Sequence, residues 1–499
     1  MKGSYYEGKR GKKKMARNLT LLTDLYELTM MQGYFHCKDA NDTVIFDMFY
    51  RNNPDGNGFA VCAGLEQVVE YIKDLHFSED DITYLRSLNI FAEDFLEYLS
   101  DFKFTGSVYA IEEGRVMFPR EPVVKVIAPI MQAQLVETAI LNIINHQSLI
   151  ATKAYRIVHA ARPDGVMEFG LRRAQGPDAG IYGARAAMIA GCVATSNVLC
   201  GQMFDVPVAG THAHSWIMSF KDELTAFRTY AEMYPDACIL LVDTYDTLKS
   251  GIPNAIKVFK EMRAAGITSK KYGIRMDSGD LAYLSKKAKK MLDDAGFTDA
   301  VISASNDLDE DLIVSLKLQG ATINSWGVGT NLITSKTQPS FGGVYKLAAI
   351  WDKDNNDWIP RIKKSENTEK ITNPGNKSIK RIYDKETGKL IADLICLEHE
   401  QYDDSKDLSL FDPIETWKKT KLPGGSYIIE DLLKPIFVDG ECVFEKVPVM
   451  KLRERFINEL ETVWDETKRL VNPHEIYVDL SKELWETKNK LLQEEHISE

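Results

Sequence analysis

The sequence predicts an α/β protein whose central part is a parallel sheet or barrel built from strand–helix units. Between residues 165 and 350, short apolar runs typical of buried strands recur at intervals of about 25 to 40 residues, each followed by a polar turn and a helical segment. The runs lie at 166–169, 206–209, 238–242, 272–276, 301–304 and 322–326. This alternation is typical of a parallel sheet covered by helices.

Three further units surround this barrel, which we place at residues 146–350. Residues 19–145 mix short β-like runs with helical stretches and predict an N-terminal α/β domain, which a helix over 134–150 joins to the barrel. Residues 351–499 begin with turn-rich stretches typical of exposed hairpins. They end in two amphipathic helices that we expect to pack back on the N-terminal domain. Residues 1–18 form a basic leader that we expect to be a solvated tail.

The composition of the chain limits the kinds of molecule that it can be expected to bind and the compartment in which it can be expected to work. The net charge of −12 over 499 residues argues against nucleic acid or an anionic membrane as a partner, because both attract a basic surface. An anionic small molecule would need a local basic pocket. The seven cysteines are scattered and odd in number, which predicts no disulfide framework and favours a reducing cytoplasm. No apolar run reaches the roughly 18 residues of a membrane span.

Polar side chains gather where the apolar runs end. The carboxyl ends of parallel strands converge on one mouth, so polar groups at six successive ends predict a common site and hence an enzyme. These groups are Arg172 and Arg173, His212 and His214, Asp243 and Asp246, Arg275 with Asp277 and Asp280, Asn306 and Asp307, and the turn at 327–330.

Two histidines, His212 and His214, stand one residue apart after the turn at Gly210 and Thr211. A histidine whose one nitrogen is hydrogen-bonded to a carboxylate, such as Asp243, can use the other as a base, a metal ligand or a nucleophile. One of the pair can also serve only to pack, and sequence alone does not say which.

Several residues near the strand ends suit a phosphorylated or planar ligand. Glycine-rich turns at 327–330 and 340–344 could bring backbone N–H groups to a phosphate. Phe169 could stack on a planar ring, and Arg172 could bind an anion. We assign Asp277 to the substrate site. The neighbouring Asp280 could cap a helix or, with other carboxylates, support Mg²⁺.

Two alternatives belong to other classes of protein. A metal-dependent barrel hydrolase would use the histidine pair to hold Zn²⁺, but it needs further ligands, and the later histidines, His399, His474 and His496, all lie outside the βα region. A non-catalytic binding barrel predicts strand ends that lack matched glycine turns, arginines and carboxylates, whereas this sequence has all three.

Five ordered motifs closely resemble those of the nicotinate phosphoribosyltransferase family, and the resemblance runs from about Leu19 to the C-terminal helices. The motifs are TDLYELTM at 23–30, EFGLRRAQG at 168–176, GTHAHS at 210–215, RMDSGDL at 275–281 and PSFGGVYK at 339–346.

The resemblance implies an enzyme that joins nicotinate to phosphoribosyl pyrophosphate, giving nicotinate mononucleotide and pyrophosphate in NAD salvage. It also implies coupled hydrolysis of ATP and a requirement for Mg²⁺, whose ligands stay unknown. The implied fold is the irregular α/β barrel of the type II phosphoribosyltransferases beside an N-terminal α/β domain. The family assembles as dimers with shared active sites.

Residue roles follow from the resemblance by position. It implies that His214 is transiently phosphorylated by ATP and that Asp243 holds its ring. Tyr26 of the partner subunit would stack on nicotinate opposite Phe169. The positions expected to contact nicotinate are Thr211 and Arg275, and those expected to hold the phosphoribosyl and phosphate groups are Arg172, Gly329, Gly342, Gly343 and Thr372.

A nicotinamide-using relative is the alternative within this class. It needs an acceptor for the amide group, typically a carboxylate, near residues 191–197, and this stretch contains no acid. A carboxylate there would repel nicotinate, so its absence favours nicotinate as the substrate.

Overall fold

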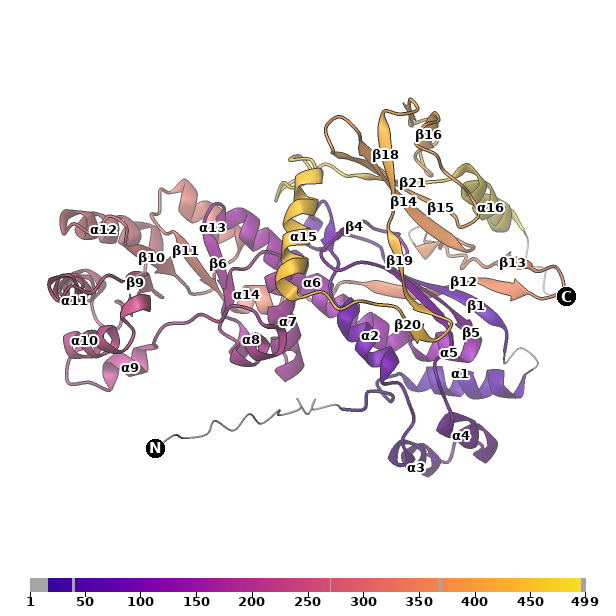
Figure 1. The fold of residues 1–499 in the computed structure, drawn as a ribbon, viewed down its shortest axis with the longest axis horizontal. Helices are drawn as coiled ribbons and strands as arrows, with labels where there is room; N and C mark the ends of the chain where they lie inside the picture. Colours follow the sequence, from indigo (N-terminus) through magenta and orange to yellow (C-terminus); the bar gives the residue numbers. More distant parts are fainter. Residues whose placement is uncertain (1–16, 38–40, 270, 368–369, 495–499) are drawn as a thin grey trace, which may run out of the picture.

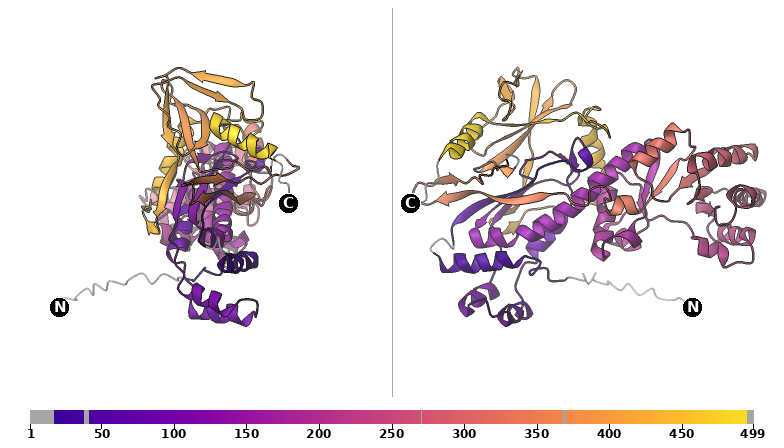
Figure 2. Two further views of the ribbon diagram at one scale, coloured as in Figure 1. Left: turned by 90° about the vertical axis from the view of Figure 1, so that its right-hand side faces the viewer. Right: turned by 180° about the vertical axis from the view of Figure 1, so that it is seen from behind.

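The computed structural model describes residues 17–37, 41–269, 271–367 and 370–494. Of the expected basic leader at 1–18, only Arg17 and Asn18 are among them. The barrel strands lie at one end of an elongated molecule, and two further sheets lie at the other (Figure 1; Figure 2 shows the side and back views). None of the described helices is both long enough and apolar enough to cross a membrane.

The barrel is a curled sheet of six parallel strands in the order β7-β6-β11-β10-β9-β8 (Figure 1). The fold class predicted from the sequence, an irregular α/β barrel beside an N-terminal α/β domain, is confirmed. The strands are β6 (Gly165–Glu168), β7 (Ala194–Thr195), β8 (Cys238–Leu241), β9 (Tyr272–Met276), β10 (Val301–Ala304) and β11 (Ser325–Val328).

Helices follow the barrel strands, and the polar residues after several strands begin them. Asp280 caps one helix by accepting from the Tyr283 N–H at 2.9 Å, and Asp309 caps another in the same way. The helices are α7 (Pro177–Ile189), α8 (Val198–Phe204), α9 (His214–Met218), α10 (Glu223–Met233), α11 (Ile252–Ala264), α12 (Leu281–Asp294), α13 (Glu310–Leu318) and α14 (Thr330–Ile333).

The strand predicted at 206–209 is wrong. Val208 makes only an isolated bridge to Thr195, and the short strand β7 occupies the edge of the sheet instead. Pro207 has no N–H to give to a ladder, and Asp205 just before the run has a φ of 53°, so the segment cannot extend the pairing.

The N-terminal sheet has the order β13-β12-β1-β5-β3-β19-β20. Its central strand β1 pairs with β12 on one side and with β5 on the other, so the barrel is inserted between two neighbours of β1. The expected barrel end at 350 therefore falls inside β12. The strands are β1 (Thr43–Tyr50), β3 (Ser107–Ile111), β5 (Val124–Pro129), β12 (Gly343–Asp352), β13 (Asp357–Pro360), β19 (Leu433–Val438) and β20 (Glu441–Cys442).

Helices and a small two-stranded sheet complete the N-terminal domain. The first helix begins just after Asp24, whose backbone N–H donates to the Glu27 carboxylate at 3.2 Å. The elements are α1 (Leu25–His36), α2 (Leu65–Lys73), α3 (Glu79–Ser87), α4 (Glu93–Ser100), α5 (Ile130–Leu135), β2 (Ala60–Val61) and β4 (Val116–Met117).

One long helix, α6 (Glu137–Ala161), joins the two halves of the molecule. It packs against α2 and β12 on the N-terminal side and against α7, α13 and β6 on the barrel side. The expected boundary at 145 lies inside this helix, so the two units share a continuous element.

The C-terminal part forms a sheet in the order β18-β14-β15-β21, with a small hairpin and two helices. Helix α15 packs against α7 and β4, whereas α16 packs against β15 and not on the N-terminal domain as expected. The elements are β14 (Lys377–Asp384), β15 (Leu390–Leu397), β16 (Leu408–Phe411), β17 (Lys419–Leu422), β18 (Tyr427–Asp431), β21 (Tyr477–Leu480), α15 (Val449–Thr462) and α16 (Lys482–Gln493).

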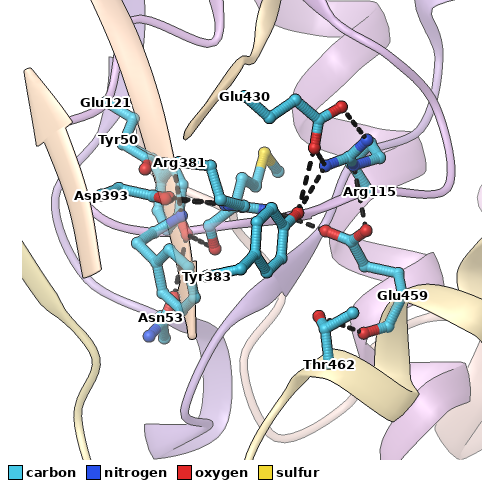
Figure 3. Close-up of polar contacts among 12 residues, drawn as sticks. Tyr50, Asn53, Arg115, Glu121, Arg381, Tyr383, Asp393, Glu430, Glu459 and Thr462 are labelled. Atoms are coloured by element: carbon cyan, nitrogen blue, oxygen red, sulfur yellow. Dashed lines mark hydrogen bonds and ion pairs between the residues drawn. The ribbon is translucent and has the colours of Figure 1, made fainter. Parts of the chain in front are cut away.

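A buried ionic network joins the C-terminal sheet to α15 and the N-terminal domain (Figure 3). Arg381 is fully buried and pairs with Asp393 and Glu459, each at 2.6 Å. Glu459 also lies 3.0 Å from Arg115. Burial, and then the neighbouring Asp393, raise the pKa of Glu121 well above its ordinary value. The raised pKa favours the protonated form of Glu121, which adds no second charge beside Asp393.

Candidate active site

The mouth of the barrel brings together side chains that follow β6, β8 and β9. Phe169 follows β6, Asp243 lies just after β8, and Arg275 lies in β9, where its register partners are Leu241 and Ser303. Thr211 and His214 reach this region from the loop before α9. We call this set, with Asp277, the barrel half-site.

Arg275 is the centre of a hydrogen-bond network. Its guanidinium donates to Thr211 Oγ1, to Ser305 Oγ and to Asp277 Oδ1, each at 2.9 Å. Ser305 also donates to Asp277. Burial alone would raise the pKa of Asp277, but the hydrogen bonds from Ser305 and Arg275 outweigh it and lower this pKa. The network holds a guanidinium in a fixed place beside an ionised carboxylate.

His214 stands at the start of α9 and lies between Thr244 and Asp243. Its Nδ1 lies 3.0 Å from Thr244 Oγ1, and its Nε2 lies 4.0 Å from Asp243 Oδ1. The side chain of His214 is 40% exposed, whereas that of Asp243 is 1% exposed. The imidazole is therefore accessible to a ligand while the carboxylate behind it is not.

His212 has a different environment, which separates the two histidines. It is buried, lies 4.7 Å from the ring of Tyr230, and accepts a hydrogen bond at Nε2 from the Leu241 N–H at 3.3 Å. Burial lowers the pKa of His212 to about 4, so it is neutral. His212 packs, and only His214 offers a ring to a substrate. Across the described ranges, no group of three or more His, Cys, Asp or Glu residues is arranged to hold a metal ion.

Phe169 is fixed by its neighbours on both sides. Its N–H donates to Val328 O at 2.8 Å, and a Cβ on Gly327 would meet its ring at 2.7 Å, so the close contact requires glycine there. The buried carboxylate of Glu168 accepts from the Gly170 N–H and, at 2.6 Å, from Thr195 Oγ1. Glu168 thereby ties together the ends of β6 and β7.

The residues expected to hold phosphate are spread more widely than those of the barrel half-site. Arg172 is exposed in a short turn after β6, and Gly329 lies beside the Phe169 carbonyl, which a Cβ would approach to 3.1 Å. Gly342 has a φ of +76°, which favours glycine. Gly343 begins β12, where a Cβ would meet Asn145 Oδ1 at 2.1 Å.

Tyr26 and Thr372 do not join the barrel half-site within one chain. Tyr26 is 46% exposed on α1, which packs against α5 in the part of the molecule across α6 from the barrel strands (Figure 1). Burial, with help from Glu137, raises the pKa of Tyr26 to about 12. Thr372 is buried, and its hydroxyl accepts from the Lys363 N–H at 3.1 Å.

Thr372 lines a basic pocket that we did not predict. Its walls include Arg120, Lys346, Lys377 and Asn373. Burial lowers the pKa of Lys346, and the charges of Lys363 and Arg51 lower it further. We call Tyr26, Thr372 and the basic residues of this pocket the sheet half-site, because β1 and β12 of the N-terminal sheet line the pocket and Tyr26 lies in the same part of the molecule. Arg120 and Lys377 lie outside the five motifs, whereas Lys346 ends the motif at 339–346, so the sequence marked only one of these basic residues.

Other residues that the sequence analysis missed stand next to predicted ones. Thr244 and Ser305 directly follow Asp243 and the run at 301–304, and both contact the barrel half-site. Serine and threonine are common after strands, so their residue type alone does not indicate a site. Only their position next to predicted site residues could have identified them.

Known proteins are similar to this chain over nearly its whole length. Three family models match it: the nicotinate phosphoribosyltransferase (NAPRTase) N-terminal domain at residues 21–145, the NAPRTase family at 165–396 and the C-terminal domain at 376–488. A nicotinate phosphoribosyltransferase of Bacillus subtilis (strain 168) is 46% identical over 96% of each chain. One from Dictyostelium discoideum is 35% identical over 94% of this chain and 88% of its own.

A solved structure agrees with these matches. The crystal structure of human nicotinic acid phosphoribosyltransferase superposes with a TM-score of 0.80 at 28% identity, covering 94% of this chain and all of the human one. Sequence and structure both match over nearly the whole chain, which confirms the resemblance carried by the five motifs. The chain therefore belongs to the nicotinate phosphoribosyltransferase family.

Proposed function

We propose that this chain joins nicotinate to phosphoribosyl pyrophosphate, giving nicotinate mononucleotide and pyrophosphate, as a step of NAD salvage. One observation carries the proposal. Hydrogen bonds to Thr211 and Asp277 fix the guanidinium of Arg275 in the same barrel mouth as Phe169. A guanidinium beside an aromatic face suits a planar ring that bears a carboxylate. The names of the full-length relatives support the same activity.

The reaction follows from this arrangement. The ring nitrogen of nicotinate forms a bond to C1 of the ribose as the bond from C1 to the pyrophosphate oxygen breaks, and pyrophosphate leaves with the electron pair. Positive charge develops on the ribose ring, so the protein must orient the pyridine and hold the leaving phosphates. Phe169 and Arg275 orient the ring, and no protein nucleophile is needed.

Mg²⁺ suits the carboxylates at the mouth. Both hydrogen bonds that Asp277 receives from side chains go to Oδ1, and Oδ2 accepts none from the residues that the structure describes. An ionised carboxylate with a free oxygen is a usual Mg²⁺ ligand, with substrate phosphates completing the shell. We propose that Asp277 holds Mg²⁺, which would neutralise charge on the leaving pyrophosphate.

We further propose that ATP phosphorylates His214. A ring nitrogen would attack the γ-phosphorus, the bond from that phosphorus to the β-phosphate oxygen would break, and ADP would leave. Water would later hydrolyse the phosphohistidine. The exposed ring of His214, with the carboxylate of Asp243 behind it, supports this role because a carboxylate stabilises a positively charged imidazole ring.

We propose that two copies form a dimer with shared active sites. Each chain has a barrel half-site and a sheet half-site that α6 keeps apart, so a complete site needs both from different copies. Exposed apolar side chains flank both half-sites, as expected for surfaces that meet. They are Leu22, Leu25, Tyr26 and Met30 around α1, and Leu171, Val198, Leu199, Met203 and Val208 around α8.

Nicotinamide is the disfavoured alternative substrate. Among the described residues, Glu168 hydrogen-bonds to the stretch at 191–197, and its two oxygens accept from the Gly170 N–H and from Thr195 Oγ1. These bonds hold the buried Glu168 carboxylate between β6 and β7 and not toward a ligand amide. We also propose a cytoplasmic location, which the seven free cysteines support.

One assay tests the proposed function. Nicotinate and nicotinamide are each incubated with phosphoribosyl pyrophosphate and Mg²⁺, with and without ATP, and the mononucleotide is measured. We expect product from nicotinate, with ATP increasing the rate, and little from nicotinamide. If neither substrate gives a mononucleotide, the proposal is wrong; if nicotinamide is preferred, the assignment of the substrate is wrong.

A further inference from the structure

We propose that Lys488, on the C-terminal helix α16, binds a phosphate group of the substrate. The proposal rests on the function proposed above, and it concerns the sheet half-site. It assigns a binding role to a helix for which the sequence suggested only packing. The ligand chemistry is a polyphosphate, supplied either by phosphoribosyl pyrophosphate or by ATP.

The first observation is the position of the Lys488 amine. Nζ donates to Asn373 Oδ1 at 2.8 Å, and Asn373 lies next to Thr372 in the wall of the basic pocket. The same wall contains Arg120 and Lys377. Helix α16 thus brings a cation next to Asn373, a lining residue of a pocket whose other walls include residues of β1, β12 and β14.

The second observation is the balance of charge in this pocket. Lys377 is neutralised by Asp47 at 2.7 Å. Over the described ranges, neither Lys488 nor Arg120 has a carboxylate within ion-pair distance. Burial, and then the charges of Arg120 and Lys377, lower the pKa of Lys488 to about 8. A half-buried ammonium among cations is unfavourable unless an anion joins them.

The third observation is the backbone of Arg120, which has a φ of +73°. Its N–H donates to Tyr50 O at 2.8 Å, which ties this residue to the end of β1. A left-handed conformation at an arginine is unfavourable and tends to occur where function requires it. Arg120 therefore lines the pocket in a strained conformation, and Lys488 lies beside the pocket through its hydrogen bond to Asn373.

The pocket is continuous with the rest of the sheet half-site. Lys346 lines it together with Thr372, and Lys346 interacts electrostatically with Glu137, which in turn contacts Tyr26. Glu137 and Lys346 thus connect Tyr26 with the pocket beside Lys488.

Packing alone does not explain a lysine at this position. Helix α16 is anchored by the buried Leu484 and by Trp485, whose ring N–H donates to Pro413 O at 3.0 Å. An apolar residue at 488 would fill the same space without the repulsion between cations. Lys490, two residues on, is exposed and provides a matched control.

The first test measures binding of pyrophosphate to the full-length chain by calorimetry. We expect Lys488→Met to weaken binding about tenfold, the effect of losing one charge-assisted contact. Lys490→Met should bind like wild type, and Lys488→Arg should retain most of the affinity. In steady-state assays, Lys488→Met should raise the KM for phosphoribosyl pyrophosphate or for ATP, whichever supplies the phosphate, and leave the KM for nicotinate unchanged. Wild-type affinity and wild-type KM values in Lys488→Met would overturn the proposal.

A second test uses the wild-type chain and does not depend on the folding of a variant. An acylating reagent at pH 8 should modify Lys488, and pyrophosphate should slow this modification but not that of Lys490, as followed by mass spectrometry. Absence of protection would overturn the proposal. Protection in a chain that forms no mononucleotide would instead support the phosphate site and refute the proposed reaction.

Discussion

Asp243 keeps one carboxylate oxygen unpaired in the direction of His214. Its Oδ2 accepts from the Asp277 N–H and from Ser278 Oγ, both at 2.7 Å. Its Oδ1 is buried, has no hydrogen-bond partner in the part of the chain that the structure describes, and lies 4.0 Å from His214 Nε2. A buried acceptor without a partner is unfavourable, and a protonated His214 ring would supply the missing donor.

Asp243→Asn should therefore weaken the coupling to ATP. The amide keeps the shape of the side chain but loses the charge that stabilises a cationic ring. We expect the steady-state level of phosphohistidine, measured with γ-labelled ATP, to fall about tenfold to a hundredfold, the range for hydrogen bonds to charged groups. An unchanged level would remove Asp243 from this role.

His214→Ala should abolish the stimulation by ATP and leave a slow, ATP-independent formation of nicotinate mononucleotide, because the transfer itself needs no histidine. Rates with and without ATP check this. The control is His212→Gln, which should retain stimulation if it folds, since His212 is buried and neutral. Stimulation that survives in His214→Ala would move the phosphoryl acceptor to another residue.

Arg275→Lys should raise the KM for nicotinate. Lysine keeps the charge but cannot reach Thr211, Ser305 and Asp277 together, and it lacks the planar pair of donors that suits a carboxylate. We expect an increase of about tenfold to a hundredfold, from the loss of one or two charge-assisted hydrogen bonds. Initial rates over a range of nicotinate concentrations measure it, and an unchanged KM would place the carboxylate elsewhere.

Shared active sites predict complementation between inactive variants. Tyr26→Ala damages the sheet half-site and Arg275→Met damages the barrel half-site. A mixed dimer would contain one site in which both halves are intact. After unfolding and refolding an equal mixture, we expect about a quarter of wild-type activity, because half of the dimers are mixed and each has one good site. Activity no higher than that of the separate variants would argue against sharing.

Glu121→Gln should reduce the dependence of stability on pH. The pKa of Glu121 is raised in the folded chain, mainly by burial and then by Asp393, so the folded state keeps a proton that the unfolded state loses above pH 4 to 5. Above that pH, the free energy of unfolding of the wild type should fall by up to about 1.4 kcal/mol per pH unit, until the folded-state pKa is reached. Glutamine has no proton to lose. Urea unfolding at pH 5 and pH 8 compares the two, and equal slopes would show that Glu121 does not titrate in this way.

The barrel half-site could be predicted from the sequence because its residues stand at the ends of apolar runs. Phe169, Asp243 and Arg275 end or follow apolar runs, and the ends of parallel strands meet. The same reasoning failed at 206–209, where an apolar run contains Pro207 and forms only an isolated bridge between Val208 and Thr195. Hydrophobicity reports burial, but a strand also needs donors on its backbone.

Of the sheet half-site, the family resemblance gave Tyr26 and Thr372 by position, but local patterns did not indicate that basic residues gather beside Thr372. Arg120, Lys346 and Lys488 come from three separate parts of the chain, and only the antiparallel pairing of β1 with β12 and the docking of α16 bring them together. His212 and His214 show that local sequence does not reveal the tertiary surroundings even of two residues close together in the chain. They are two residues apart, yet one is enclosed by aromatic rings and the other is accessible, a difference that tertiary packing creates.

The insertion of the barrel between β5 and β12 sets an order for synthesis on the ribosome. All six barrel strands lie within residues 165–328, so they emerge together, before β12 and β19 exist. The partners that β12 and β19 provide for the N-terminal sheet therefore become available only after the barrel strands have emerged. Until then β1 keeps an open edge, which is the kind of surface that aggregates in nascent chains. In chains that terminate before β12, the edge of β1 stays uncovered, and we expect these chains to remain bound to chaperones. In full-length chains β12 covers this edge, and we expect the chaperones to be released.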